Sequence, residues 1–160
     1  DLANPENLGN RGRELRMQKK NCLYLSVVSA QESLFYGDVL SIQVSGVEGE
    51  FGILPGHTPL LTRIKPGAVH LTDLEQNEQF MYLSGGIIEV QPHKVTILAD
   101  VAIRGEELDE KAAQEAKQLA EESMAMQLPQ EEYSEAALQL ACAVAKLRVI
   151  KMLRTMEKRR

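Results

Sequence analysis

The feature that most constrains the fold is a change of hydrophobic period near Arg104. Before this residue, apolar and polar residues alternate in short runs, which places successive side chains on opposite faces of a strand. After Gly105 the chain contains no glycine, and its apolar residues recur every three or four positions, which is the period of a helix. The pattern predicts a β domain over residues 17–104 and a helical region over residues 105–160.

Five alternating runs in the first part are predicted to be strands: CLYLSVV, VLSIQVS, FMYLS, IIEVQ and KVTILAD. The second run would place Leu40, Ile42 and Val44 inside and Ser41, Gln43 and Ser45 outside. Turn residues separate the runs at Gly37-Asp38, Pro66-Gly67, Gln76-Asn77, Gly85-Gly86 and Pro92-His93, and Gly85-Gly86 is expected to close a hairpin. Short strands at this spacing predict an antiparallel β-sandwich or barrel.

The second part is predicted to form two amphipathic helices joined by a turn at Pro129, an αα-hairpin. Asp109 is the expected N-cap of the first helix. Its small-residue stripe, along which a second helix can approach closely, is Ala112, Ala116, Ala120 and Ser123. The second helix is expected to begin at about Glu131 or Ser134, and its apolar stripe is Leu138, Cys142, Ala145, Val149, Met152 and Met156. So narrow a hairpin must dock on the β domain or on a partner.

One apolar segment, GVEGEFGILPGHTPLLTRIKPG from Gly46 to Gly67, is interrupted by five glycines and three prolines. No strand or helix is expected to run through it unbroken. Its apolar side chains are more than a single loop needs, so we expect some to fill the β core and others to contact a partner.

Charge is distributed unevenly along the chain, whose net charge is −5. The last fifteen residues, from Lys146, contain seven basic residues against one acid, whereas residues 104–135 contain ten acids and three bases. A basic end of this kind is typical of contact with an acidic partner or a polyanion, although a solvated helix face has the same pattern.

The sequence contains no catalytic or metal-binding motif that we can identify. His57, His70 and His93 fall in separate segments without metal-ligand spacing, and Cys22 and Cys142 are expected to be buried or idle thiols rather than a disulfide. We therefore expect no catalytic residue, no metal and no cofactor.

Two other classes of function are a nucleic-acid or polyanion binder with a basic tail and a small β-fold enzyme. The acidic body and an aromatic content of 4% disfavour the first, and the missing catalytic constellation disfavours the second.

Three segments, taken in order, resemble the epsilon subunit of bacterial F-type ATP synthases: GEFGILPGHTPLLTRIKPG, YLSGGIIEVQPHKVTILAD and ADVAIRGEELDEKAAQEAKQLAEE. The resemblance runs from about Asn21 to Lys158. Residues 1–16 lie outside it and are expected to be a flexible leader or a cloning remnant, because Met17 would be a natural start. The resemblance implies a β-sandwich with a helical hairpin, acting as a non-catalytic central-stalk subunit. It also implies a peripheral position on the cytoplasmic side of a bacterial plasma membrane.

The resemblance also implies contacts with the other subunits. The loop facing the ring of c subunits would be Ser45, Gly46, Val47, Glu48, Gly49 and Glu50, with Glu50 available to pair with basic groups of the ring. The side facing the gamma subunit would carry Ser29, His57 and Thr62. The inhibitory helix, which would reach gamma and the alpha and beta subunits, would use Arg148, Val149, Lys151, Met152, Arg154, Met156 and Lys158.

One departure from the family concerns nucleotide binding. Some members bind ATP through Ile/Leu-Asp-x-x-Arg-Ala at the start of the hairpin, and the matching residues here are Leu108, Asp109, Lys111 and Ala113. Ala112 stands where the motif has arginine. Because lysine cannot reproduce the geometry of a guanidinium, we expect weak or no ATP binding.

Overall fold

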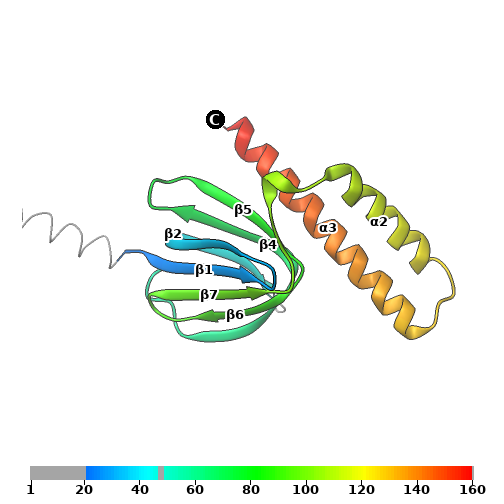
Figure 1. Ribbon diagram of the computed structural model, residues 1–160, viewed down its shortest axis with the longest axis horizontal. Coiled ribbons are helices and arrows are strands. Elements are labelled where there is room, and N and C mark those ends of the chain that lie inside the picture. Colours follow the sequence, from blue (N-terminus) through cyan, green and yellow to red (C-terminus); the bar gives the residue numbers. More distant parts are fainter. Residues whose placement is uncertain (1–20, 47–48, 160) are drawn as a thin grey trace, which may run out of the picture.

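A computed structural model describes residues 21–46 and 49–159, and shows a β domain with a helical hairpin against one side (Figure 1). The predicted leader, residues 1–16, lies outside the described residues, as do Val47 and Glu48. The strands are β1 (Leu23–Ser29), β2 (Ser33–Gly46), β3 (Gly49–Ile53), β4 (Leu60–Asp73), β5 (Glu78–Leu83), β6 (Gly86–Val90), β7 (Lys94–Ala99) and β8 (Ala102–Arg104). The 3₁₀ turn η1 (Gly105–Glu107) leads into the helices α2 (Glu110–Met124) and α3 (Gln130–Lys158).

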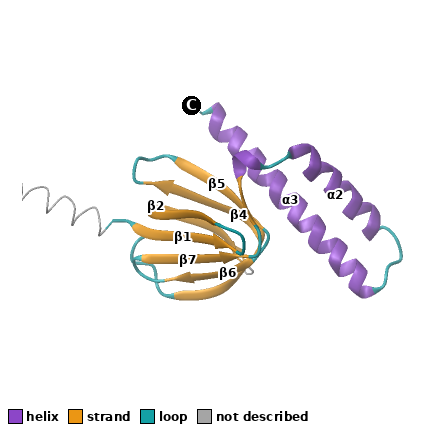
Figure 2. Cartoon of the chain, viewed as in Figure 1, coloured by secondary structure: helices purple, strands orange, loops and turns teal. Residues whose placement is uncertain are grey.

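The strands form one sheet in the order β3-β2-β1-β7-β6-β4-β5-β8. The sheet closes on itself because β2 also pairs with β4. Among the described residues, every ladder is antiparallel except that between β1 and β7. Figure 2 shows the strands in one body and both helices outside it. The predicted fold class, a β-sandwich followed by a two-helix hairpin, is confirmed, with the β1–β7 ladder as its one parallel pair.

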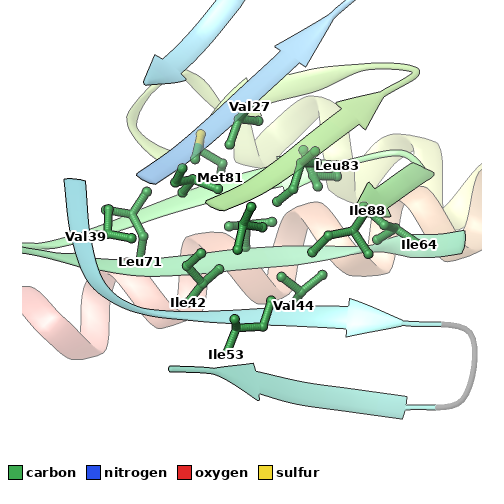
Figure 3. Packing of buried hydrophobic residues seen from close by; sticks show 14 of the residues in the cluster. Val27, Val39, Ile42, Val44, Ile53, Ile64, Leu71, Met81, Leu83 and Ile88 are labelled. Atoms are coloured by element: carbon green, nitrogen blue, oxygen red, sulfur yellow. The ribbon is translucent and has the colours of Figure 1, made fainter. Parts of the chain in front are cut away.

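The interior of the β domain is filled by alternate residues of its strands, as Figure 3 shows for Val27, Ile42 and Leu71. Leu23, Leu25 and Val27 of β1 are fully buried, and Val95 and Ile97 of β7 are buried in the same cluster. Both strands therefore bury one of their two faces, as their alternating sequences predict.

The faces predicted for β2 are partly wrong. Ile42 and Val44 are buried as expected, but Leu40 is only partly buried and its neighbour Val39 is buried instead, where the pairing with β4 shifts register. Ser45 is only 3% exposed although its position predicted an outward side chain. The pairing of β2 with β4 shifts register between Val44 and Gly46, which breaks the alternation there. A side chain on Gly67 would place its Cβ 2.5 Å from the Ser45 Cβ and Oγ. This close approach of β2 and β4 requires small residues on both strands.

Two of the predicted turns lie inside strands. Gly37-Asp38 is part of β2, and Pro66-Gly67 is part of β4. β4 pairs with β6 through Leu60–Ile64 and with β5 from Gly67 onward, so Pro66 falls where the strand changes partners. A proline, which has no N–H to donate, is tolerated at such a switch.

The predicted hairpin at Gly85-Gly86 is wrong. In the described sheet β5 and β6 each pair with β4 and not with one another. Gly86 has a φ of 146°, and a Cβ there would lie 2.1 Å from the Leu98 carbonyl oxygen. Glycine is needed because β6 and β7 approach closely at this point, rather than because the chain reverses between paired strands.

The hairpin begins as expected. The Asp109 carboxylate accepts a hydrogen bond of 3.1 Å from the Ala112 N–H, which is the geometry of an N-cap. The small-residue stripe is partly wrong, because Ala113 and Ala120 are the buried residues of α2 whereas Ala112 and Ala116 are exposed. The stripe that packs along α3 is therefore displaced by one position at its start.

Helix α3 packs on β4 and β5 through a second apolar cluster, which we call the docking cluster. Its buried members are Ala68, Phe80 and Tyr82 of the sheet with Ala145, Val149 and Leu153 of α3. Cys142, Met152 and Met156 are partly buried against it, as the predicted stripe requires. Leu138 belongs to the same stripe but is 54% exposed, because the first half of α3 extends beyond the sheet (Figure 1).

Tyr82 lies at the centre of the docking cluster and is 2% exposed. Burial raises the pKa of Tyr82 well above the ordinary tyrosine value, and a hydrogen bond with the Cys142 side chain adds to the rise. The Lys146 ammonium lies 5.2 Å from the centre of the Tyr82 ring. The docking of α3 therefore depends on a neutral phenol.

The raised pKa of Tyr82 predicts a pH-dependent stability. The neutral phenol stabilises the folded form fully below the unfolded pKa, about 10, and this contribution is lost as the pH rises above that value. The free energy of unfolding, measured with urea at increasing pH, should fall more steeply for the unaltered chain than for Tyr82→Phe. Equal slopes for the two proteins would contradict the assignment.

Candidate functional site

The candidate sites are surfaces, and the first is the end of the β domain at the β2–β3 connection. Ser45 pairs with Glu50 and Gly46 pairs with Gly49, while Val47 and Glu48 between them lie outside the described residues. The Ser45 side chain is buried, so it is not available at the surface of the folded chain. The Glu50 side chain is 54% exposed, and its carboxylate forms an ion pair with Arg148 of α3. The loop expected to face the ring and the helix expected to be inhibitory, which the sequence separates by about a hundred residues, therefore touch through Glu50 and Arg148.

Beside this ion pair the packing of α3 is incomplete. A cavity of about 150 Å³ lies between α3 and strands β2 to β4, bounded by Phe51, Arg148 and Met152 among others. A second cavity of about 390 Å³ follows α3 towards its end, between Phe80 and Lys151. The C-terminal part of α3 is thus held by a small apolar contact and by charged groups at its margin.

His70 lies between these two cavities and was not assigned to any site from the sequence. Its ring stacks on Phe80 with 4.4 Å between centroids, and its Nε2 is 3.0 Å from Oε1 of Glu78. These contacts fix His70 as part of the wall beneath α3. Within residues 21–46 and 49–159, no group of three His, Cys, Asp or Glu side chains could hold a metal ion.

The residues expected to face gamma do not form one cluster. Ser29 pairs with Ala99 at one end of the β1–β7 ladder, and its hydroxyl bonds within the turn that follows β1. The His57 loop is tied to the other end, because the Gly56 N–H donates to the Pro92 carbonyl at 2.8 Å. Thr62 is paired with Ile88 on a partly buried face between them. The three positions are spread along the strands rather than gathered at a point.

On the outer face of the sheet, one cross-strand row includes exposed apolar side chains, and it was not predicted from the sequence. Arg63, Ile87, Leu98 and Val28 are in register across β4, β6, β7 and β1. Ile87 is 46% exposed and Leu98 is 54% exposed. The signal was available, since Leu98 occupies the position between Ile97 and Ala99 where the alternation of β7 calls for a polar residue. We call these four residues the outer row, and such a row is typical of a docking surface.

The residues of α3 that are expected to be inhibitory largely make contacts within the molecule. Val149 is fully buried in the docking cluster, and Met152 and Met156 are partly buried there. Arg154 donates two hydrogen bonds to the Glu110 carboxylate of α2, one of them 3.0 Å from Nη1 to Oε1, and this contact raises the pKa of Arg154. Lys151 and Lys158 are exposed, and neither forms an ion pair with any described residue.

Most residues at the positions of the nucleotide motif make contacts that stabilise the fold. Leu108 packs partly buried against the docking cluster, Ala113 is buried between the helices, and Asp109 caps α2. Lys111 is exposed, as is Ala112, at the position where the motif has arginine. Positions 108–113 therefore supply one cation, Lys111, and no arginine of their own.

Within the described parts of the chain, no helix combines the length and the apolar composition needed to cross a bilayer.

Residues 22–105 match the ATP synthase Delta/Epsilon chain beta-sandwich domain, and residues 106–151 match the ATP synthase Delta/Epsilon chain long alpha-helix domain.

Two solved structures share the fold. A chain of the Euglena gracilis mitochondrial ATP synthase, from a structure of OSCP, F1 and c-ring, is 20% identical with a TM-score of 0.72, and the match covers 78% of this chain and 79% of that one. A chain of the Tetrahymena thermophila mitochondrial ATP synthase, from its central stalk and c-ring, is 11% identical with a TM-score of 0.56, covering 80% and 96%. With both family domains matched in order, the chain belongs to the ATP synthase delta/epsilon family and is a non-catalytic subunit of the central stalk.

Proposed function

We propose that this subunit joins the gamma subunit to the ring of c subunits, and that its helical hairpin inhibits ATP hydrolysis by the catalytic head. The proposed inhibitory role is supported by the separation of two apolar clusters, the core of the β domain and the docking cluster. The core of the β domain contains no residue of α2 or α3, whereas the docking cluster joins α3 to β4 and β5. The hairpin can therefore leave the β domain without opening its core.

The joint to the rotor would use two parts of the β domain. The outer row offers apolar side chains on a rigid sheet, which suits a gamma subunit that must transmit torque. The β2–β3 end, with the exposed Glu50, would meet basic groups of the c subunits. Rigid strands lose little conformational entropy on docking, so more of the contact energy remains for the joint.

The inhibitory contacts would be made by α3. Its basic residues would pair with acidic segments of the beta subunits, while Val149, Met152 and Met156 would pack on gamma or alpha.

The proposed location is peripheral, on the cytoplasmic side of a bacterial plasma membrane, and it is supported by the sequence motifs. Both solved relatives described above are mitochondrial. Binding of nucleic acid by the basic tail has less support, because two of its arginines, Arg148 and Arg154, are already ion-paired.

Truncation after Pro129 tests the inhibitory role. It removes α3 but no member of the β core, so the β domain should remain folded, as circular dichroism and urea unfolding would show. ATP hydrolysis by the assembled head should rise several-fold, because the inhibitory helix is absent. A folded, assembled truncation that hydrolyses ATP at the original rate would overturn the proposal.

Charge reversal of two unpaired lysines tests the electrostatic part. Lys151→Glu with Lys158→Glu breaks no ion pair of the folded form and keeps good helix formers. If these residues meet acidic beta-subunit segments, inhibition should weaken about tenfold, because attraction becomes repulsion. The matched control, Lys151→Arg with Lys158→Arg, keeps the charge and should remain inhibited. Equal inhibition by both variants would exclude this contact.

ATP binding is expected to be absent at micromolar concentrations. A dissociation constant of 1 μM corresponds to about −8 kcal/mol, which a site lacking the motif guanidinium should not reach. Calorimetry on the isolated chain measures this directly. Ala112→Arg is the informative comparison, since Ala112 is exposed in the first turn of α2 and tolerates a larger side chain. A clear micromolar isotherm for the unaltered chain would refute the expectation.

A further inference from the structure

We infer that the folded hairpin is a masked form, in which Glu50 and Glu110 occupy the arginines of α3 that would otherwise bind the catalytic head. The inhibitory consequence rests on the proposed function, whereas the masking itself is a property of the free chain. The two ion pairs are Glu50–Arg148, from β3 to α3, and Glu110–Arg154, from α2 to α3.

The two pairs hold α3 to two different elements. Arg148 and Arg154 are six residues apart, which places them about 9 Å apart along the helix and on different sides of it. Arg148 reaches the β domain, and Arg154 reaches the neighbouring helix. Movement of α3 away from the sheet breaks the first pair, and separation of the two helices breaks the second. Full extension of the hairpin frees both arginines together.

The Arg154–Glu110 contact has the stronger geometry. The guanidinium donates from Nη1 and Nη2 to the two carboxylate oxygens, so the contact is bidentate. Glu110 is also the first residue of α2, where a carboxylate already suits the helix dipole. A carboxylate at position 110 is thus favourable independently of Arg154.

Exposed ion pairs shift an equilibrium only modestly, by about two- to fivefold each. They matter here because the docking cluster is small and open hollows lie beside it. Where two arrangements are close in free energy, a combined shift of about tenfold changes which one dominates. Lys151 and Lys158 stay unpaired in the folded form and can attract acidic segments before the arginines are released.

The native thiol of Cys142 reports the docking of α3, because it is partly buried in the docking cluster. The test compares the rate of Cys142 alkylation in the free full-length chain, located by mass spectrometry so that Cys22 does not interfere. Glu50→Gln with Glu110→Gln should raise this rate about four- to twentyfold. The matched control, Glu32→Gln with Glu115→Gln, removes two carboxylates that form no ion pair among the described residues and should leave the rate unchanged.

Two further measurements separate a specific ion pair from general destabilisation. Added salt should raise the Cys142 rate of the unaltered chain, and should have a smaller effect on the double variant. The charge exchange Glu50→Arg with Arg148→Glu should restore a slow rate, although each single change should raise it. Rates equal to those of the control, or no recovery in the charge exchange, would overturn the masking.

The inhibitory consequence is measured on a catalytic head with gamma but without the c ring, where Glu50 has no ring partner. There Glu50→Gln with Glu110→Gln should lower ATP hydrolysis about two- to tenfold, because released arginines favour the inhibitory arrangement. Unchanged hydrolysis, with truncation still activating, would overturn this consequence. If truncation does not activate, the proposed function fails, and the Cys142 rates still decide the masking.

Discussion

The rest of the structure depends on the pairing of β2 with β4, which closes the sheet. It is possible only because Ser45 and Gly67 let the two backbones approach closely where the register shifts. Closure removes one face of β1, β2 and β4 to β7 from water and leaves their other face outside the core. The free face is then divided between the outer row, on β1, β7, β6 and β4, and the surface of β4 and β5 that receives α3.

This division explains why the two parts of the molecule differ in stability. Among the described residues, eighteen buried apolar side chains form the β core and six form the docking cluster. At about 1.5–3 kcal/mol for each large side chain removed from water, the core outweighs the docking contact severalfold. Three of the six members of the docking cluster also come from the sheet. The β domain is therefore a stable platform, and the hairpin is the part that can move.

The sequence predicted what depends on local pattern and failed where pairing partners decide. The sequence predicted the alternation of β1 and β7, the cap at Asp109 and the stripe around Val149, because each depends on neighbours within one segment. The burial of Ser45 and the course of β4 through Pro66 were not, because both follow from the register between distant strands. The Glu50–Arg148 contact could not be predicted either, because it joins residues that are far apart in the sequence. Each of the two residues was predicted to belong to a different surface.

The apolar stripe and the charges of α3 have different consequences for regulation. Val149, Met152 and Met156 serve the folded form by packing on the sheet, and the proposed inhibitory form would bury the same side chains elsewhere. A change in this stripe weakens both forms, so it cannot set the balance between them. The arginines differ, because their partners in the folded form are Glu50 and Glu110 of this chain, whereas those in the proposed inhibitory form would belong to another subunit. Without the c ring, substitution of the internal acids would change the folded hairpin and leave the proposed inhibitory contacts intact. The balance between folded and inhibitory hairpins is therefore most readily adjusted at carboxylates outside α3.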